Sequence, residues 1–121
     1  SMAGKIPTPK STIYAATKAF VIQFSNALRM ECQDHDIAIT TVNLGPVRTG
    51  FFDFADRTGK YRTSVEKYML DPDKVARKVV EALYTNKREI NLPFWMQLGS
   101  GWYSFTPRMM ERFLQPLFRK K

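Results

Sequence analysis

The chain has 121 residues and a formal net charge of +8, from 19 Lys and Arg against 11 Asp and Glu. This length allows one domain of ordinary size and not two. A hydrophobic fraction of 44% and a charged fraction of 25% argue against disorder throughout. With one Cys and one His, the sequence excludes an intrachain disulfide framework and a Cys/His zinc cluster, so we expect no metal. The single cysteine also fits a reducing compartment, and we expect a cytoplasmic protein.

The first part of the chain predicts a loop followed by a long helix. Residues 1–10 contain one glycine and two prolines and indicate a loop. Apolar residues then recur at four-residue spacing, with Ser11 or Thr12 as a possible cap. The helix is expected to end near residues 33–36, where polar residues cluster.

The middle of the chain predicts two strands joined by a helix. Residues 37–43 are β-branched and nearly uncharged, as in strands of parallel sheets, and residues 89–92 form a second candidate strand. Between them, the Asp-Pro-Asp sequence at residues 71–73 predicts a helix start. Strand, helix and strand make one crossover unit of a parallel sheet. Two strands need neighbours to form a stable sheet, so further strands are expected.

Two segments carry many aromatic residues. In residues 50–70 the apolar positions follow no sustained helical or strand periodicity, and we expect a mobile loop with short helical pieces. Residues 94–121 are also basic, with a helix predicted over residues 107–118 that breaks near Pro116. Such a segment can lie on an anionic membrane, or pack on the core or on a partner subunit. We favour packing over membrane contact and expect no nucleic-acid partner. For the function of the whole chain, one hypothesis is a membrane- or partner-binding module without catalysis, as an alternative to an enzyme.

The sequence Tyr14-Ala-Ala-Thr-Lys18 carries the main chemical signal. Residues four apart on a helix lie on one face, so the phenol and the ammonium group can converge. A nearby cation favours phenolate, and a tyrosine poised in this way can exchange a proton with a carbonyl or an alcohol. The pair alone also fits a half-buried tyrosine beside a solvated lysine. Its context is Ser1, thirteen residues upstream, and the sequence Gly-Pro-Val-Arg-Thr at residues 45–49 after the first strand.

This combination resembles the classical short-chain dehydrogenase/reductase family over nearly the whole chain. Residues 70–73 and 88–93 are similar to a group of bacterial oxidoreductases of poorly defined substrate. The resemblance implies an α/β fold, the C-terminal half of a Rossmann-type doubly wound parallel sheet spanning residues 1–121. The N-terminal nucleotide-binding strands are absent, since no Gly-x-x-x-Gly-x-Gly occurs in the sequence. We therefore expect a missing N-terminal half as a partner, and an inactive chain when it is alone.

The resemblance also implies catalytic roles for three residues. Tyr14 would be the general acid/base of an NAD(P)-dependent oxidoreductase that transfers hydride between nicotinamide and a small carbonyl or secondary alcohol. Lys18 would hydrogen-bond the nicotinamide ribose and favour the phenolate of Tyr14. Ser1 would orient and polarise the substrate carbonyl. Ser1-Met2 also fits a remnant of tag removal, but the spacing to Tyr14 favours a native serine.

The remaining implied site residues follow the first strand. Gly45, Pro46, Val47 and Thr49 would meet the nicotinamide of NAD or NADP, with the Val47 backbone and the Thr49 hydroxyl fixing its carboxamide. The family usually has proline where Leu44 stands, which should soften the turn more than it changes the chemistry. Residues 50–70 would form a substrate lid. The resemblance further implies a homo-oligomer, dimer or tetramer, formed through the C-terminal segment (residues 94–121) and the long helix.

Overall fold

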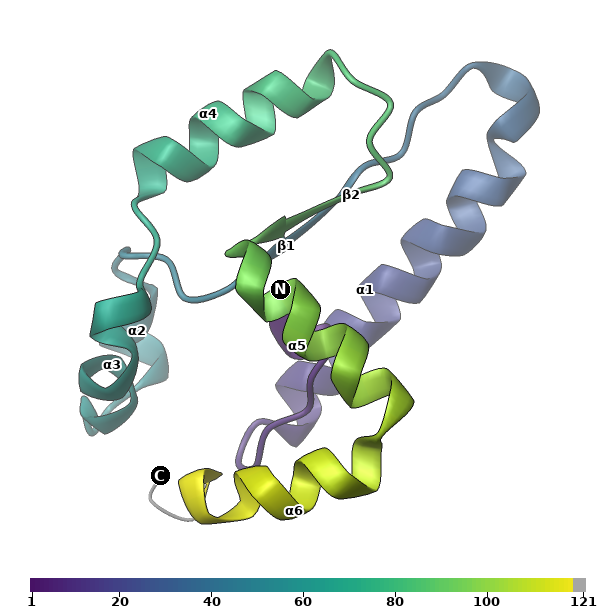
Figure 1. Ribbon diagram of the computed structural model, residues 1–121. Helices are drawn as coiled ribbons and strands as arrows, with labels where there is room; N and C mark the ends of the chain where they lie inside the picture. The colour runs from purple at the N-terminus through teal and green to yellow at the C-terminus, as the bar shows by residue number, and fades with distance from the viewer. Residues whose placement is uncertain (119–121) are drawn as a thin grey trace.

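The computed structural model describes residues 1–118 and shows helices arranged around two short strands (Figure 1). In chain order the elements are η1 (Met2–Gly4), α1 (Thr12–Glu31), η2 (Gln33–His35), β1 (Thr41–Leu44), α2 (Phe51–Ala55), α3 (Lys60–Val65), η3 (Glu66–Tyr68), α4 (Pro72–Leu83), β2 (Glu89–Leu92), α5 (Phe94–Phe105) and α6 (Pro107–Phe118).

The two strands form a parallel pair joined by α4. Their register places Thr41 opposite Glu89 at one end and Leu44 opposite Leu92 at the other. In Figure 1 the pair runs between α1 and α4. The predicted crossover unit is therefore confirmed as a small parallel sheet in a mixed α/β chain, while the larger doubly wound sheet stays a prediction.

The predicted start of α4 is confirmed in detail. The side chain of Asp71 accepts a hydrogen bond from the backbone N–H of Lys74 at 3.0 Å, and Pro72 is the first helical residue. The start of α1 differs from this pattern. Ser11 occupies the cap position, but its hydroxyl donates to the carbonyl oxygen of Thr8 at 2.8 Å instead of capping the helix.

Four element predictions were wrong in extent. Strand β1 occupies Thr41–Leu44, later than the expected residues 37–43, because β2 begins opposite Thr41 and leaves residues 37–40 without a strand partner. The expected loop at the start contains η1. Helix α5 was not predicted, since glycines and aromatic residues lower helix propensity. Helix α6 continues to Phe118 without the expected break, because a proline so near the end removes only one hydrogen bond.

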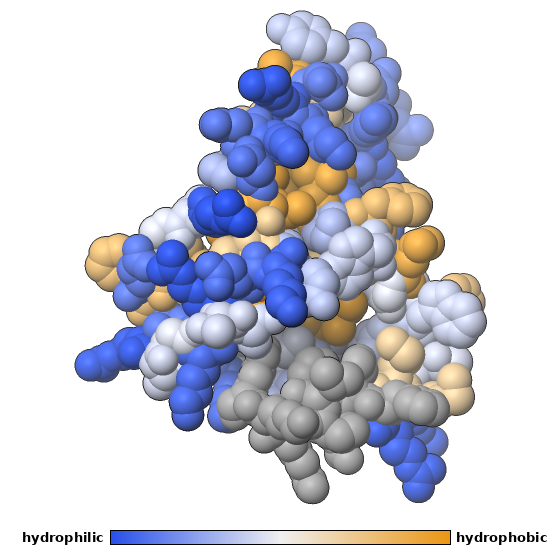
Figure 2. Space-filling view, turned by 60° about the vertical axis from the view of Figure 1, so that its left-hand side comes forward, coloured by the Kyte–Doolittle hydropathy of each residue, from blue (hydrophilic) through white to orange (hydrophobic). Residues whose placement is uncertain are grey.

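The core of the described residues is small. Met2 is 2% exposed and Phe52 8%, and most other large apolar side chains keep open surface. Figure 2 shows hydrophobic residues open at the surface between hydrophilic ones. None of the described helices combines the length and the apolar character needed to cross a bilayer. The chain therefore has apolar surface left for further contacts.

Candidate active site

The first turns of α1 bring Tyr14 and Lys18 together. The Lys18 Nζ lies 5.4 Å from the centroid of the Tyr14 ring, at the one-turn separation that their spacing predicts. The Tyr14 side chain lies at an open surface, with 39% of the residue exposed. The geometry leaves the phenol accessible and sets a cation against its ring. The catalytic roles of both residues stay predictions.

Ser1 lies near Lys18, at the start of η1. Its Oγ accepts a hydrogen bond from the Ala3 backbone N–H at 3.2 Å, which leaves the hydroxyl proton free to be donated. The structure places η1 beside the first half of α1, where the two elements are in extensive contact.

Gly4 explains how η1 approaches α1 so closely. A Cβ at this position would lie 2.7 Å from the Lys18 carbonyl carbon, 2.8 Å from the Ala19 nitrogen and 2.8 Å from Ile22 Cδ1. Only a residue without a side chain can rest on the helix backbone in this way. Gly4 is thus a positioning residue for Ser1 that the sequence analysis missed.

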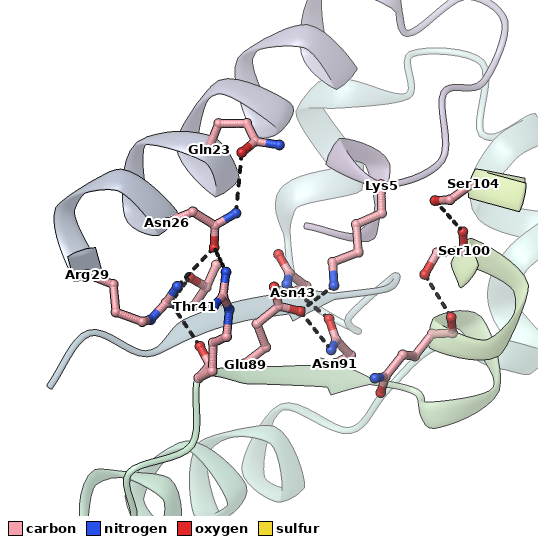
Figure 3. A network of polar contacts seen from close by, with 12 residues as sticks. Lys5, Gln23, Asn26, Arg29, Thr41, Asn43, Glu89, Asn91, Ser100 and Ser104 are labelled. Carbon is pink, nitrogen blue, oxygen red and sulfur yellow. Dashed lines mark hydrogen bonds and ion pairs between the residues drawn. The ribbon is translucent and has the colours of Figure 1, made fainter. Parts of the chain in front are cut away.

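A polar network ties the same N-terminal segment to the strands (Figure 3). Lys5 pairs with the carboxylate of Glu89, which also accepts a hydrogen bond from Asn91 Nδ2 at 3.2 Å. Asn91 Oδ1 in turn accepts from Asn43 Nδ2 at 3.0 Å, and Asn43 is 1% exposed. Burial raises the pKa of Glu89, but hydrogen bonds from Lys5 and Asn91 outweigh burial and hold it below its ordinary value. Sequence reasoning missed this network, and the signal that could have found it is an asparagine near the end of each predicted strand.

Gly45, at the start of the expected nicotinamide turn, packs against the end of β2. Its N–H donates to the carbonyl oxygen of Leu92 at 2.6 Å. A Cβ on Gly45 would lie 2.8 Å from Met96 Sδ and 3.0 Å from Pro93 Cδ. The glycine therefore packs closely against the segment after β2, and a larger residue there would displace the Met96 and Pro93 side chains.

The rest of this turn closes the base of the expected lid. Val47 forms an isolated parallel bridge with Leu70. The Leu70 N–H donates to the carbonyl oxygen of Pro46 at 2.8 Å, and the Arg48 N–H donates to that of Leu70 at 2.9 Å. Thr49 Oγ1 accepts a hydrogen bond from the Phe51 N–H at 3.4 Å. Residues 50–70 therefore leave and return at the same place in the fold.

Residues 50–70 fold into α2, α3 and η3, which confirms the expected short helical pieces. The Phe51 ring lies 6.5 Å from the Tyr14 ring, and Phe52 packs edge-on against Phe51 at 5.3 Å. The Tyr61 ring lies 5.8 Å from Phe52. Burial and the charge of Tyr14 raise the pKa of Tyr61. The expected lid thus places an aromatic cluster beside Tyr14.

Two hollows in the structure are lined by residues other than Tyr14 and Lys18. One lies between α4 and β2, lined by residues such as Lys78 and Ile90. The other lies between η1, α1 and α5, lined by residues such as Gln23 and Ser100. The chemistry predicted for Tyr14 therefore belongs to an open surface of this chain.

Comparisons with known proteins agree with the motifs. Residues 1–58 match the sequence profile described as short chain dehydrogenase. The uncharacterized oxidoreductase YbbO of Escherichia coli K12 is 32% identical over 98 residues, covering 77% of this chain and 36% of that protein. The 11-beta-hydroxysteroid dehydrogenase A of Sesamum indicum is 28% identical over 120 residues, covering 88% of this chain and 33% of that protein.

A third relative matches a shorter stretch. Sulfoacetaldehyde reductase 2 of Chromohalobacter salexigens is 43% identical over 51 residues, covering 42% of this chain and 20% of that protein. No solved structure is significantly similar to the chain. The chain spans about a third of the length of the first two relatives. The Tyr14–Lys18 pair and the parallel crossover unit agree with these matches. The chain therefore belongs to the short-chain dehydrogenase/reductase family.

Proposed function

We propose that the protein is an NAD(P)-dependent oxidoreductase that interconverts a carbonyl compound and an alcohol, with Tyr14 as general acid/base. The observation that carries the proposal is the accessible Tyr14 phenol with the Lys18 ammonium one helical turn away. Ser1, held against the same part of α1, would donate a second hydrogen bond to the substrate oxygen. Two donors on one oxygen stabilise the negative charge that develops there during reduction.

The residues present fit the nicotinamide end of the cofactor. The Lys18 ammonium can hydrogen-bond ribose hydroxyls, and the Val47 backbone with the Thr49 hydroxyl can hold a carboxamide. The bound cofactor would supply or accept the hydride, while this chain's residues orient the substrate and move the proton. The sequence contains no Gly-x-x-x-Gly-x-Gly to hold the pyrophosphate. We therefore propose that a further segment completes the cradle and that the chain alone is inactive.

The relatives' names do not fix the substrate. One names sulfoacetaldehyde, a small anion, and another a hydroxysteroid, a large apolar alcohol.

The test replaces Tyr14 in the full-length protein that carries this chain. The Tyr14→Phe variant keeps the ring and removes the acid, so turnover of an aldehyde with NAD(P)H should fall by about 10²–10⁴-fold. Binding of the dinucleotide should persist. The matched control is Tyr84→Phe, at a residue that is 87% exposed at the end of α4. Unchanged turnover in Tyr14→Phe would remove Tyr14 as the acid, and a wild-type protein without any turnover would favour a binding module.

A further inference from the structure

We infer that Phe51 and Tyr14 form an apolar wall that selects carbonyl substrates carrying an aromatic or alkyl group beside the reacting carbon. The inference rests on the proposed function, because it assigns the substrate class of the same site. Phe51 is the first residue of α2, directly after the turn expected to meet the nicotinamide.

The two rings leave a shared apolar surface open. Their centroids are 6.5 Å apart and their planes are tilted by 41°. Phe51 is 53% exposed and Tyr14 is 39% exposed, so neither ring is covered by the other. A substrate group laid against Phe51 would remove apolar surface from water while its carbonyl stays beside the Tyr14 hydroxyl.

Phe51 is backed by other residues of the lid. Phe52, which is 8% exposed, packs edge-on against it at 5.3 Å, and the Tyr61 ring lies 5.8 Å from Phe52. The hydrogen bonds of Leu70 with Pro46 and Arg48 close the lid at its base. A wall supported in this way loses little freedom when a substrate binds.

The charge next to Phe51 in α2 is already paired. The Asp53 carboxylate accepts a hydrogen bond from the Arg62 guanidinium at 2.6 Å. Selection at Phe51 therefore comes from ring contact rather than from charge. The proposed function assigns the nearby Lys18 ammonium to the cofactor ribose, so ring contact at Phe51 favours an apolar aldehyde or ketone over a small anionic one.

The experiment compares two aldehydes in the full-length protein, benzaldehyde and glyoxylate, at saturating NAD(P)H. Wild type should prefer benzaldehyde. Phe51→Ala should lower kcat/KM for benzaldehyde about tenfold, mainly through a higher KM. The same variant should change kcat/KM for glyoxylate by less than about twofold. Phe51→Leu should recover most of the benzaldehyde activity because it restores apolar contact. The matched control is Tyr84→Ala, which removes an aromatic ring that is 87% exposed at the end of α4 and outside the lid, and it should change kcat/KM for neither substrate.

The outcomes separate this inference from the proposed function. Equal losses for both aldehydes in Phe51→Ala would overturn the inference, since Phe51 would then only support the lid. A wild-type preference for glyoxylate would overturn it as well. In both cases, Tyr14-dependent turnover would leave the proposed function standing. A wild-type protein that reduces neither aldehyde would overturn both.

Discussion

Gly4 shows how one residue without a side chain can determine where a candidate catalytic group lies. Its backbone rests on that of Lys18 and Ala19, closer than any Cβ would allow. Ser1 is three residues earlier, in the same 3-10 turn that its own Oγ caps. The distance between Ser1 and Lys18 is therefore set by a glycine that takes no part in proton transfer.

A Gly4→Ala substitution should separate η1 from α1. Because the contacts at 2.7 and 2.8 Å involve backbone atoms, the strain cannot be relieved by a rotamer change, and we expect a loss of about 1–3 kcal/mol in the free energy of unfolding. Gly99→Ala is the matched control. Gly99 lies in the middle of α5, and a Cβ at this position would meet nothing within 4 Å. Gly99→Ala should therefore leave the free energy of unfolding unchanged or raise it by up to about 1 kcal/mol. Urea unfolding of both variants measures the difference, and equal effects would contradict the close-packing role.

Individual residues were predictable where chemistry follows from local spacing. The approach of Tyr14 and Lys18 follows from helix geometry alone. The Asn43–Asn91 hydrogen bond depends on strand register between residues 48 positions apart, and no local pattern specifies it. The Gly4 contact likewise exists only once η1 has docked on α1. These contacts could not be predicted from the sequence because they depend on tertiary packing.

At the scale of elements, signals at helix ends predicted more than composition did. Asp71 and Pro72 located the start of α4 to the residue. Composition predicted the wrong bounds for β1, because the length of this strand is limited to the residues that can pair with β2. It also missed α5, which packs on β2 and η1 and is stabilised by those contacts despite its two glycines.

The ion pair between Lys5 and Glu89 connects elements from opposite ends of the chain, and its strength should depend on pH. The folded-state pKa of Glu89 is lowered, so its charge adds stability that is present above the ordinary glutamate pKa, about 4.3, and is lost as pH falls through the folded value. Glu89→Gln should cost about 1 kcal/mol at pH 7, and the difference from wild type should shrink below pH 4.3.

Urea unfolding of wild type and Glu89→Gln at pH 7 and below pH 4 tests this dependence. Lys5→Met provides a second variant, because it removes the partner and should reproduce most of the same pH effect. A difference between wild type and Glu89→Gln that does not change with pH would show that the charge of Glu89 contributes nothing.

At the scale of the whole molecule, α1 has an exposed apolar surface without a role in the candidate site. Ile13, Phe20 and Phe24 are 82%, 68% and 55% exposed, and the Phe20 and Phe24 rings stack at 6.0 Å. Ala16 and Ala27, also exposed, continue the same face at helical spacing. Exposed apolar faces of this kind favour contact with another protein surface. We propose that this stripe contributes to the expected homo-oligomer.

The full-length protein should therefore have the mass of a dimer or a tetramer in light scattering. Phe20 and Phe24 are stacked on one face, so replacing both with glutamate should place two charges in the contact and lower the mass to that of a smaller species. Phe54→Glu is the matched control, since it adds a charge at an 89% exposed phenylalanine of the lid and should leave the mass unchanged. Tyr14-dependent turnover, measured in the same samples, distinguishes loss of assembly from loss of fold. A monomeric wild type would contradict the proposed contact between copies of the protein through α1.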